Sequence, residues 1–233
     1  MFYPRKRIQQ HKRLANHTKT VYNCPMSMDI SVYTGGPCMC NGYLVRGENG
    51  YIAIDAPLGF TAWVRRQLQE GERVSDLLIT HQHFDHVQDA AELARTYGCC
   101  THACKAYSRE LTLETLARSS GWGIEVEPFT VDDAFGPAAT EREWGGLRWH
   151  LHHIPGHSPD GMAYGLPEHE QVFCGDILFA GSVGRTDFPG GSMSQLVRGI
   201  REQLLYLPHT TTVHSGHGPA TTLAEEQLNN PYL

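Results

Sequence analysis

The sequence lacks any apolar run near the roughly 20 residues that a membrane-spanning helix needs, so we expect no membrane partner. Its N-terminus lacks the apolar core of a secretory signal. Basic charge is also scarce, because 19 Lys and Arg stand against 25 Asp and Glu for a formal net charge of −6. This balance excludes a protein that binds nucleic acid through an overall positive charge. We therefore expect a cytoplasmic protein without a nucleic-acid partner.

The cysteines do not have the pattern of a disulfide framework, since there are seven of them in 233 residues, an odd number in a long chain. Reduced thiols are the favoured interpretation. Cys99, Cys100 and Cys104, with His102 between them, are an alternative small zinc site, which Cys38 and Cys40 would join. Their spacing matches no ribbon or finger pattern.

Acidic residues are missing from the first part of the chain, where no acid precedes Asp29 while six Lys and Arg occur before residue 20. Residues 1–28 are therefore expected to form a basic, solvated extension. An organelle address or a contact with an anionic partner is the alternative. The rest, residues 29–233, has the length of one large domain.

Short β-rich runs and amphipathic helices alternate twice along residues 29–233. Strands are expected within 29–56, with a hairpin turn at 46–51, and at 74–80, 147–155, 162–167, 171–179 and 211–219. Helices are expected at 61–72, 89–98, 109–121, 192–208 and 222–233, with Ser192 or Ser194 as an N-cap for the fourth. This order predicts an α+β fold, a layered sandwich in a single domain.

Histidine is abundant, with 14 residues, and the segment ITHQHFDHV contains three of them. It follows an apolar strand and supplies His81, His83, Asp85 and His86. Burying so many polar groups is costly unless something binds them, and a divalent metal does so.

Three further donors stand at strand-to-loop junctions: His157 in IPGHSPDG, Asp176 in FCGDILF and His217 in VHSGHGPA. The total of five histidines and two aspartates exceeds the number of ligands that one tetrahedral zinc ion takes. It suits two divalent metal ions with a shared carboxylate. Nitrogen and oxygen donors suit Zn, Fe or Mn, and we expect zinc first.

The motifs THQHFDHV, PGHSPDG, CGDILFAGSVGRTDFPGG and SGHGPATT, followed by NNPYL, resemble those of the metallo-β-lactamase fold, most closely its glyoxalase II-like hydrolase branch. The resemblance covers nearly all of residues 29–233. It implies a four-layer αββα sandwich with two metal ions at one sheet edge. By the same resemblance His81, His83 and His157 bind the first metal, Asp85, His86 and His217 bind the second, and Asp176 bridges both.

The resemblance also implies an activity, the hydrolysis of a small-molecule thioester such as S-lactoylglutathione. The expected nucleophile is a hydroxide held between the metals. Asp85 aligns it and Asp176 holds the metals together, so both are the expected catalytic carboxylates. Arg185 corresponds to a family residue that contacts glutathione; alternatively it pairs internally with Asp187. The chain ends soon after His217, without the C-terminal helical region that helps glyoxalase II to hold glutathione.

Several alternatives remain open at this point. His214 competes with His217 for the second site, and the glycine pair around His217 favours the latter. His150, His152 and His153 are expected to be structural, although His152 or His153 would suit a role in orienting a ligand. His11, His17, His102 and His169 are expected at the surface. The rival functions are a persulfide dioxygenase with one iron on His81, His157 and Asp176, and a non-catalytic metal-binding scaffold. The sequence does not indicate the oligomeric state.

Overall fold

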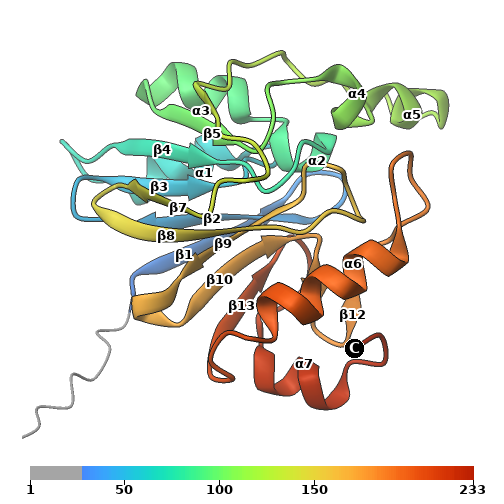
Figure 1. Cartoon of the computed structure of the whole chain (residues 1–233). Helices are drawn as coiled ribbons and strands as arrows, with labels where there is room; N and C mark the ends of the chain where they lie inside the picture. The colour runs from blue at the N-terminus through green and yellow to red at the C-terminus, as the bar shows by residue number, and fades with distance from the viewer. Residues whose placement is uncertain (1–27) are drawn as a thin grey trace, which may run out of the picture.

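The computed structural model describes residues 28–233, so the basic extension predicted at 1–28 lies outside the described residues except for Met28. Two sheets of six strands each face one another, and helices cover both outer faces (Figure 1). This arrangement confirms the predicted α+β sandwich in a single domain. Within the described residues, no helix is both long and apolar enough to cross a membrane.

The first sheet contains the N-terminal strands in sequence order. Strands β1, β2 and β3 pair antiparallel, and β3 to β6 pair parallel. Arg46 pairs with Tyr51 at the end of β2 and β3, which confirms the predicted hairpin. The bounds are β1 (Ile30–Gly35), β2 (Cys40–Arg46), β3 (Tyr51–Ile54), β4 (Val74–Leu78), β5 (Cys100–Ala103) and β6 (Asp133–Ala134).

The second sheet has the order β14-β13-β10-β9-β8-β7 and is antiparallel except between β10 and β13. A separate small hairpin is formed by β11 (Leu178–Phe179) and β12 (Ser182–Val183). The sheet's strands are β7 (Glu141–Trp144), β8 (Leu147–His153), β9 (Met162–Leu166), β10 (Gln171–Gly175), β13 (Thr212–Ser215) and β14 (Thr221–Thr222).

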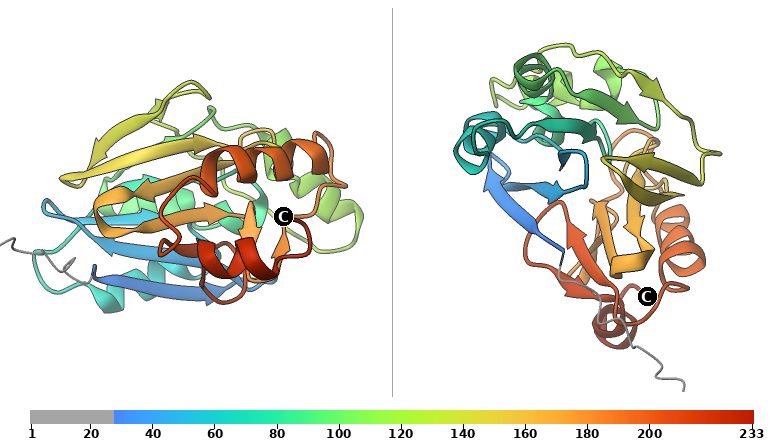
Figure 2. Two further views of the ribbon diagram at one scale, coloured as in Figure 1. Left: turned by 60° about the horizontal axis from the view of Figure 1, so that its bottom comes forward. Right: turned by 90° about the vertical axis from the view of Figure 1, so that its left-hand side faces the viewer.

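Helices α1 and α3 cover the first sheet, and α6 and α7 cover the second (Figures 1 and 2). Helix α6 continues as a π-helical turn, η2, and η1 is a short 3₁₀ turn. The bounds are α1 (Phe60–Gln67), α2 (Phe84–Val87), α3 (Ala90–Tyr97), α4 (Arg109–Thr112), α5 (Glu114–Ser119), η1 (Pro167–His169), α6 (Met193–Gly199), η2 (Ile200–Leu204) and α7 (Leu223–Asn229).

Three apolar clusters separate the four layers. The middle cluster lies between the sheets, where Ile52 and Ile54 of the first meet Trp149 and Phe173 of the second. The two outer clusters lie between each sheet and its helices. Burial of this apolar surface is the main force that holds the layers together.

Two predicted elements differ in detail. The helix predicted at 109–121 is broken into α4 and α5 at Leu113, which has a left-handed φ of 56°. The strand predicted at 171–179 ends at Gly175, with a φ of 49° that favours glycine. That turn separates β10 from β11 and leaves Asp176 between them. Ser192 does cap α6, because its hydroxyl accepts a hydrogen bond from the Gln195 amide.

His102 was predicted at the surface, and this prediction is wrong. Its side chain is buried on β5, where its Nε2 lies 2.9 Å from Oδ1 of Asp76. The carboxylate gives one ring nitrogen a partner, while the buried Nδ1 makes no hydrogen bond. His169 is half-buried, and His11 and His17 lie outside the described residues.

Candidate metal centre

The seven predicted donors come together at one edge of the sandwich, although they lie on four separate segments. His81 and His83 follow β4, and α2 carries the next two donors. The loops after β8, β10 and β13 supply the others. The complete set is His81, His83, Asp85, His86, His157, Asp176 and His217.

The first cluster consists of three buried histidines. Nδ1 of His83 lies 3.1 Å from Nε2 of His81 and 2.9 Å from Nε2 of His157. Burial, with the nearby His157, lowers the pKa of His83 to about 3, so this ring is neutral near pH 7. Three ring nitrogens that lie close together form a set of donors that suits a metal ion.

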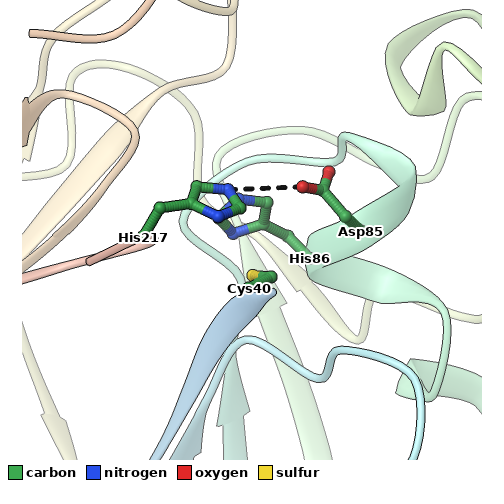
Figure 3. Close-up of side chains that lie close together, drawn as sticks. All are labelled: Cys40, Asp85, His86 and His217. Atoms are coloured by element: carbon green, nitrogen blue, oxygen red, sulfur yellow. Dashed lines mark ion pairs between the residues drawn. The ribbon is translucent and has the colours of Figure 1, made fainter. Parts of the chain in front are cut away.

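The second cluster contains Asp85, His86 and His217, together with a residue that the sequence analysis did not assign to it, Cys40. One potential ligand atom from each lies within 4.8 Å of the others (Figure 3). Nε2 of His217 is 3.3 Å from Oδ2 of Asp85. The sequence did contain a signal for Cys40, which is a cysteine next to a predicted strand. It was considered only as a ligand of the alternative zinc site formed by Cys99, Cys100 and Cys104.

Asp176 lies between the two clusters. Its Oδ2 is 3.4 Å from Nε2 of His157 and 3.5 Å from Nε2 of His217, and its Oδ1 is 3.3 Å from Nε2 of His86. Burial opposes ionisation of this carboxyl group, but the positive charges of the neighbouring histidines outweigh it and lower the pKa of Asp176. An ionised carboxylate in this place can bind a cation on each side.

The donors fit divalent cations, because two of their buried atoms face each other at 3.3 Å without forming a hydrogen bond. Nε2 of His86 and Oδ1 of Asp176 are buried and make no hydrogen bond. Leaving such atoms unsatisfied costs about 1–3 kcal/mol each. Burial opposes a charge on His86, but Asp55 and Asp176 are among the acidic groups that raise its pKa well above the usual value. The site therefore has a negative potential that favours a cation.

A buried acid that the sequence analysis missed, Asp55, orients two of the rings. The Nδ1–H of His86 donates to Oδ2 of Asp55 over 2.7 Å. The Nδ1–H of His81 donates to Oγ1 of Thr80 over 3.1 Å, and this hydroxyl donates to Oδ2 of Asp55 over 2.7 Å. Both rings are consequently held with Nε2 toward the site. The available signal was an acid at the end of the apolar segment YIAID.

Backbone carbonyls orient two other rings. Nδ1 of His157 lies 2.8 Å from the Arg185 oxygen, and Nδ1 of His217 lies 3.1 Å from the Cys38 oxygen. Gly216 allows the close approach of this last loop, since a Cβ there would collide with Oδ1 of Asp176. A side chain at position 216 is therefore incompatible with the observed site.

The alternative histidines lie elsewhere. Nε2 of His214 lies 2.7 Å from Oε1 of Gln171, and its ring stacks on Phe173 with centroids 4.6 Å apart. His153 contacts the Pro159 carbonyl, and His152 borders a small separate hollow. Among residues 28–233, neither of these two is in a group that could hold a metal. Within residues 28–233, the groups that could hold a metal do not include the cysteines proposed for the other zinc site, Cys99, Cys100 and Cys104.

A cavity of about 440 Å³ opens over the two clusters. Its floor includes His83, Asp85, His157 and Asp176. One part of the lining comes largely from α4, α5 and their loops and is mainly apolar, and the lining also contains Arg185 and Phe188. The apolar residues of the first part are Phe84, Leu113, Leu116, Ala117 and Trp122.

Arg185 is at the rim of this cavity, but its charge is already paired. Its Nε and a terminal nitrogen lie 2.7 and 2.6 Å from the two oxygens of Asp187, and its guanidinium is 4.1 Å from the centre of the Phe188 ring. The structure therefore contains the internal pair that the sequence analysis gave as the alternative to a substrate contact.

Comparison with known proteins agrees with this geometry. The family described as the metallo-β-lactamase superfamily matches residues 35–217. Hydroxyacylglutathione hydrolase GloC from Haemophilus influenzae is 32% identical over 210 residues, which cover 89% of this chain and 98% of the relative. The probable metallo-hydrolase YqgX from Bacillus subtilis is 33% identical over 201 residues, covering 85% and 94%. The crystal structure of TTHA1623 in a di-iron-bound form is 34% identical and superposes with a TM-score of 0.74, covering 87% of this chain and 100% of that one. The chain belongs to the metallo-β-lactamase superfamily, and this membership supports a metal-dependent hydrolase.

Proposed function

We propose that the protein is a hydrolase with two metal ions that cleaves a small-molecule thioester. The observation that carries this proposal is the position of Asp176, whose two oxygens face ring nitrogens of both donor clusters. A carboxylate shared in this way is typical of two-metal hydrolytic sites. The similarity to a relative named hydroxyacylglutathione hydrolase supports a thioester as the substrate.

The protein's own side chains would divide the work between the two clusters. His81, His83 and His157 would hold one cation, and Asp85, His86 and His217 the other. Divalent cations bound there lower the pKa of water towards neutrality and polarise a carbonyl group. Asp85 would orient the attacking oxygen, and Asp176 would fix the separation of the cations. A thiolate leaving group needs little help from an acid, because a thiol has a pKa of about 8.5.

The cavity favours a substrate with an apolar part. The side formed by Leu113, Leu116 and Trp122 would accommodate the hydrocarbon of an acyl or thiol group. Glutathione carries carboxylates, and Arg185 is the candidate to bind one of them. Asp187 competes for the same guanidinium, so glutathione binding requires this pair to open or to share its charge.

The decisive experiment combines metal quantification with an S-lactoylglutathione assay on the purified protein. We expect two metal ions per chain, with zinc preferred over iron or manganese, and hydrolysis that stops on chelation and returns when metal is restored. A single iron with oxygen uptake on glutathione persulfide would replace this proposal with the dioxygenase. A protein that binds no metal would contradict both enzymes.

A further inference from the structure

The thiol of Cys40 lies among the donors of the second cluster. Cys40 is the first residue of β2 and is fully buried. Its sulfur lies within 4.8 Å of one ligand atom each of Asp85, His86 and His217, and Figure 3 shows it beside the His86 ring. The seven donors suggested by the motifs would bind metal through nitrogen or oxygen atoms only. The sulfur atom of Cys40 would be an eighth donor of a different kind.

A second observation shows that this group is prepared for a ligand. The His86 side chain is 0% exposed, and its Nε2 makes no hydrogen bond. Its other nitrogen is fixed by Asp55 at 2.7 Å, so the ring cannot turn away without losing that bond. The unbonded Nε2 faces Oδ1 of Asp176 at 3.3 Å, so the ring is held toward the proposed metal centre.

The spacing of these atoms suits ligation of one ion. With zinc–nitrogen bonds of about 2.0 Å and a zinc–sulfur bond of about 2.3 Å, neighbouring donors are about 3.5 Å apart. Asp85 and His217 already have this spacing, at 3.3 Å. Asp176 also faces the first cluster, so the second has only three donors of its own unless the thiol takes part.

We propose that Cys40 binds the cation of the second cluster as a thiolate, alongside Asp85, His86, His217 and the shared Asp176. When the cation binds, the S–H proton passes to solvent and a sulfur–metal bond forms, with no change in oxidation state. The inference rests on the proposed two-metal site and adds a donor to it. A soft sulfur donor would make this position prefer zinc or cobalt over manganese, while the first keeps three imidazoles.

Cobalt provides a test that does not depend on activity. The full-length protein is stripped of metal and loaded with Co²⁺ to two ions per chain. We expect an intense near-ultraviolet sulfur-to-cobalt absorption band in the wild type and its loss in Cys40→Ser. In the zinc form, X-ray absorption should contain a sulfur shell at about 2.3 Å.

Cys38→Ser is the matched control, because Cys38 borders the same cavity but is not in the four-donor group. This variant should keep the band. A wild type that binds two cobalt ions without the band would overturn the role of Cys40 and leave the two-metal proposal intact. Loss of the band in Cys38→Ser but not in Cys40→Ser would show that Cys38 supplies the sulfur ligand, and it would overturn the role of Cys40. Failure to bind cobalt at all would refute the proposed metal site itself.

Discussion

The Nδ1–H of His86 donates to Oδ2 of Asp55 over 2.7 Å, and both side chains are buried. Asp55 has a left-handed φ of 56° and also accepts hydrogen bonds from the amide and hydroxyl of Thr80. One carboxylate therefore holds a ring of the second cluster and, through Thr80, a ring of the first. Its position couples the orientation of the two proposed metal sites.

We expect Asp55→Asn to weaken metal binding by about 10- to 100-fold, because the ring of His86 loses its anionic partner. Competitive titration with a chromophoric chelator would measure this. Asp89→Asn is the control, since Asp89 is buried nearby but accepts only from the backbone amides of Gly59 and Thr61. Both variants should lower the free energy of unfolding. Equal metal affinity in the two would refute the orienting role.

His217→Ala should lose one of the two metal ions and most of the hydrolysis, because it removes a donor that only the second cluster uses. Metal analysis by mass spectrometry and a thioester assay would measure both. His214→Ala, three residues earlier and stacked on Phe173, should keep both ions. If His217→Ala retains two ions and the full rate, the assignment of the second cluster is wrong.

Arg185→Ala should raise KM more for glutathione thioesters than for simple thioesters, if the guanidinium binds a substrate carboxylate. Asp187→Asn removes the competing carboxylate and should lower KM for the glutathione compound alone. Steady-state kinetics on both substrates would compare the variants. Changes of equal size on both substrates would instead identify the Arg185–Asp187 pair as part of the rim structure.

The buried pair of His102 and Asp76 predicts a stability effect far from the metal centre. Burial alone would raise the pKa of Asp76, but hydrogen bonds from His102 and Ser75 lower it below 3.8. Because the pKa of Asp76 is lower in the folded state, its ionised carboxylate stabilises the fold at pH values above the unfolded-state pKa. This stability is lost as the pH falls through the folded-state pKa. Asp76→Asn should therefore lower the free energy of unfolding by about 1–2 kcal/mol at pH 7. It should also reduce the loss of stability that the wild type shows as the pH falls. Denaturant titrations at several pH values would test this prediction. If the variant loses as much stability at acid pH as the wild type does, the prediction is contradicted.

The fold was predictable from the sequence because the apolar runs of β2, β3 and β4 and the amphipathic helices have clear periodicities. The resemblance supplied the order of layers that periodicity alone left open. Local strain was not predictable. Leu113 breaks one helix and Gly175 ends one strand through left-handed backbone conformations, and no residue pattern at those positions distinguishes them from a continuous element.

The convergence of the seven donors followed from their positions at strand ends, where loops of adjacent strands meet. Asp55 and Cys40 were missed because each is a single polar residue beside an apolar strand, and their closeness to His86 depends on pairing between distant strands. The same limit applies to His102, whose partner Asp76 lies 26 residues away on β4.

The first cluster draws His81 and His83 from one half of the chain and His157 from the other, and the two halves belong to opposite sheets. A cation held by these rings would link the two sheets at one end. Co-expressed fragments divided between the sheets would then depend on metal for their reassembly.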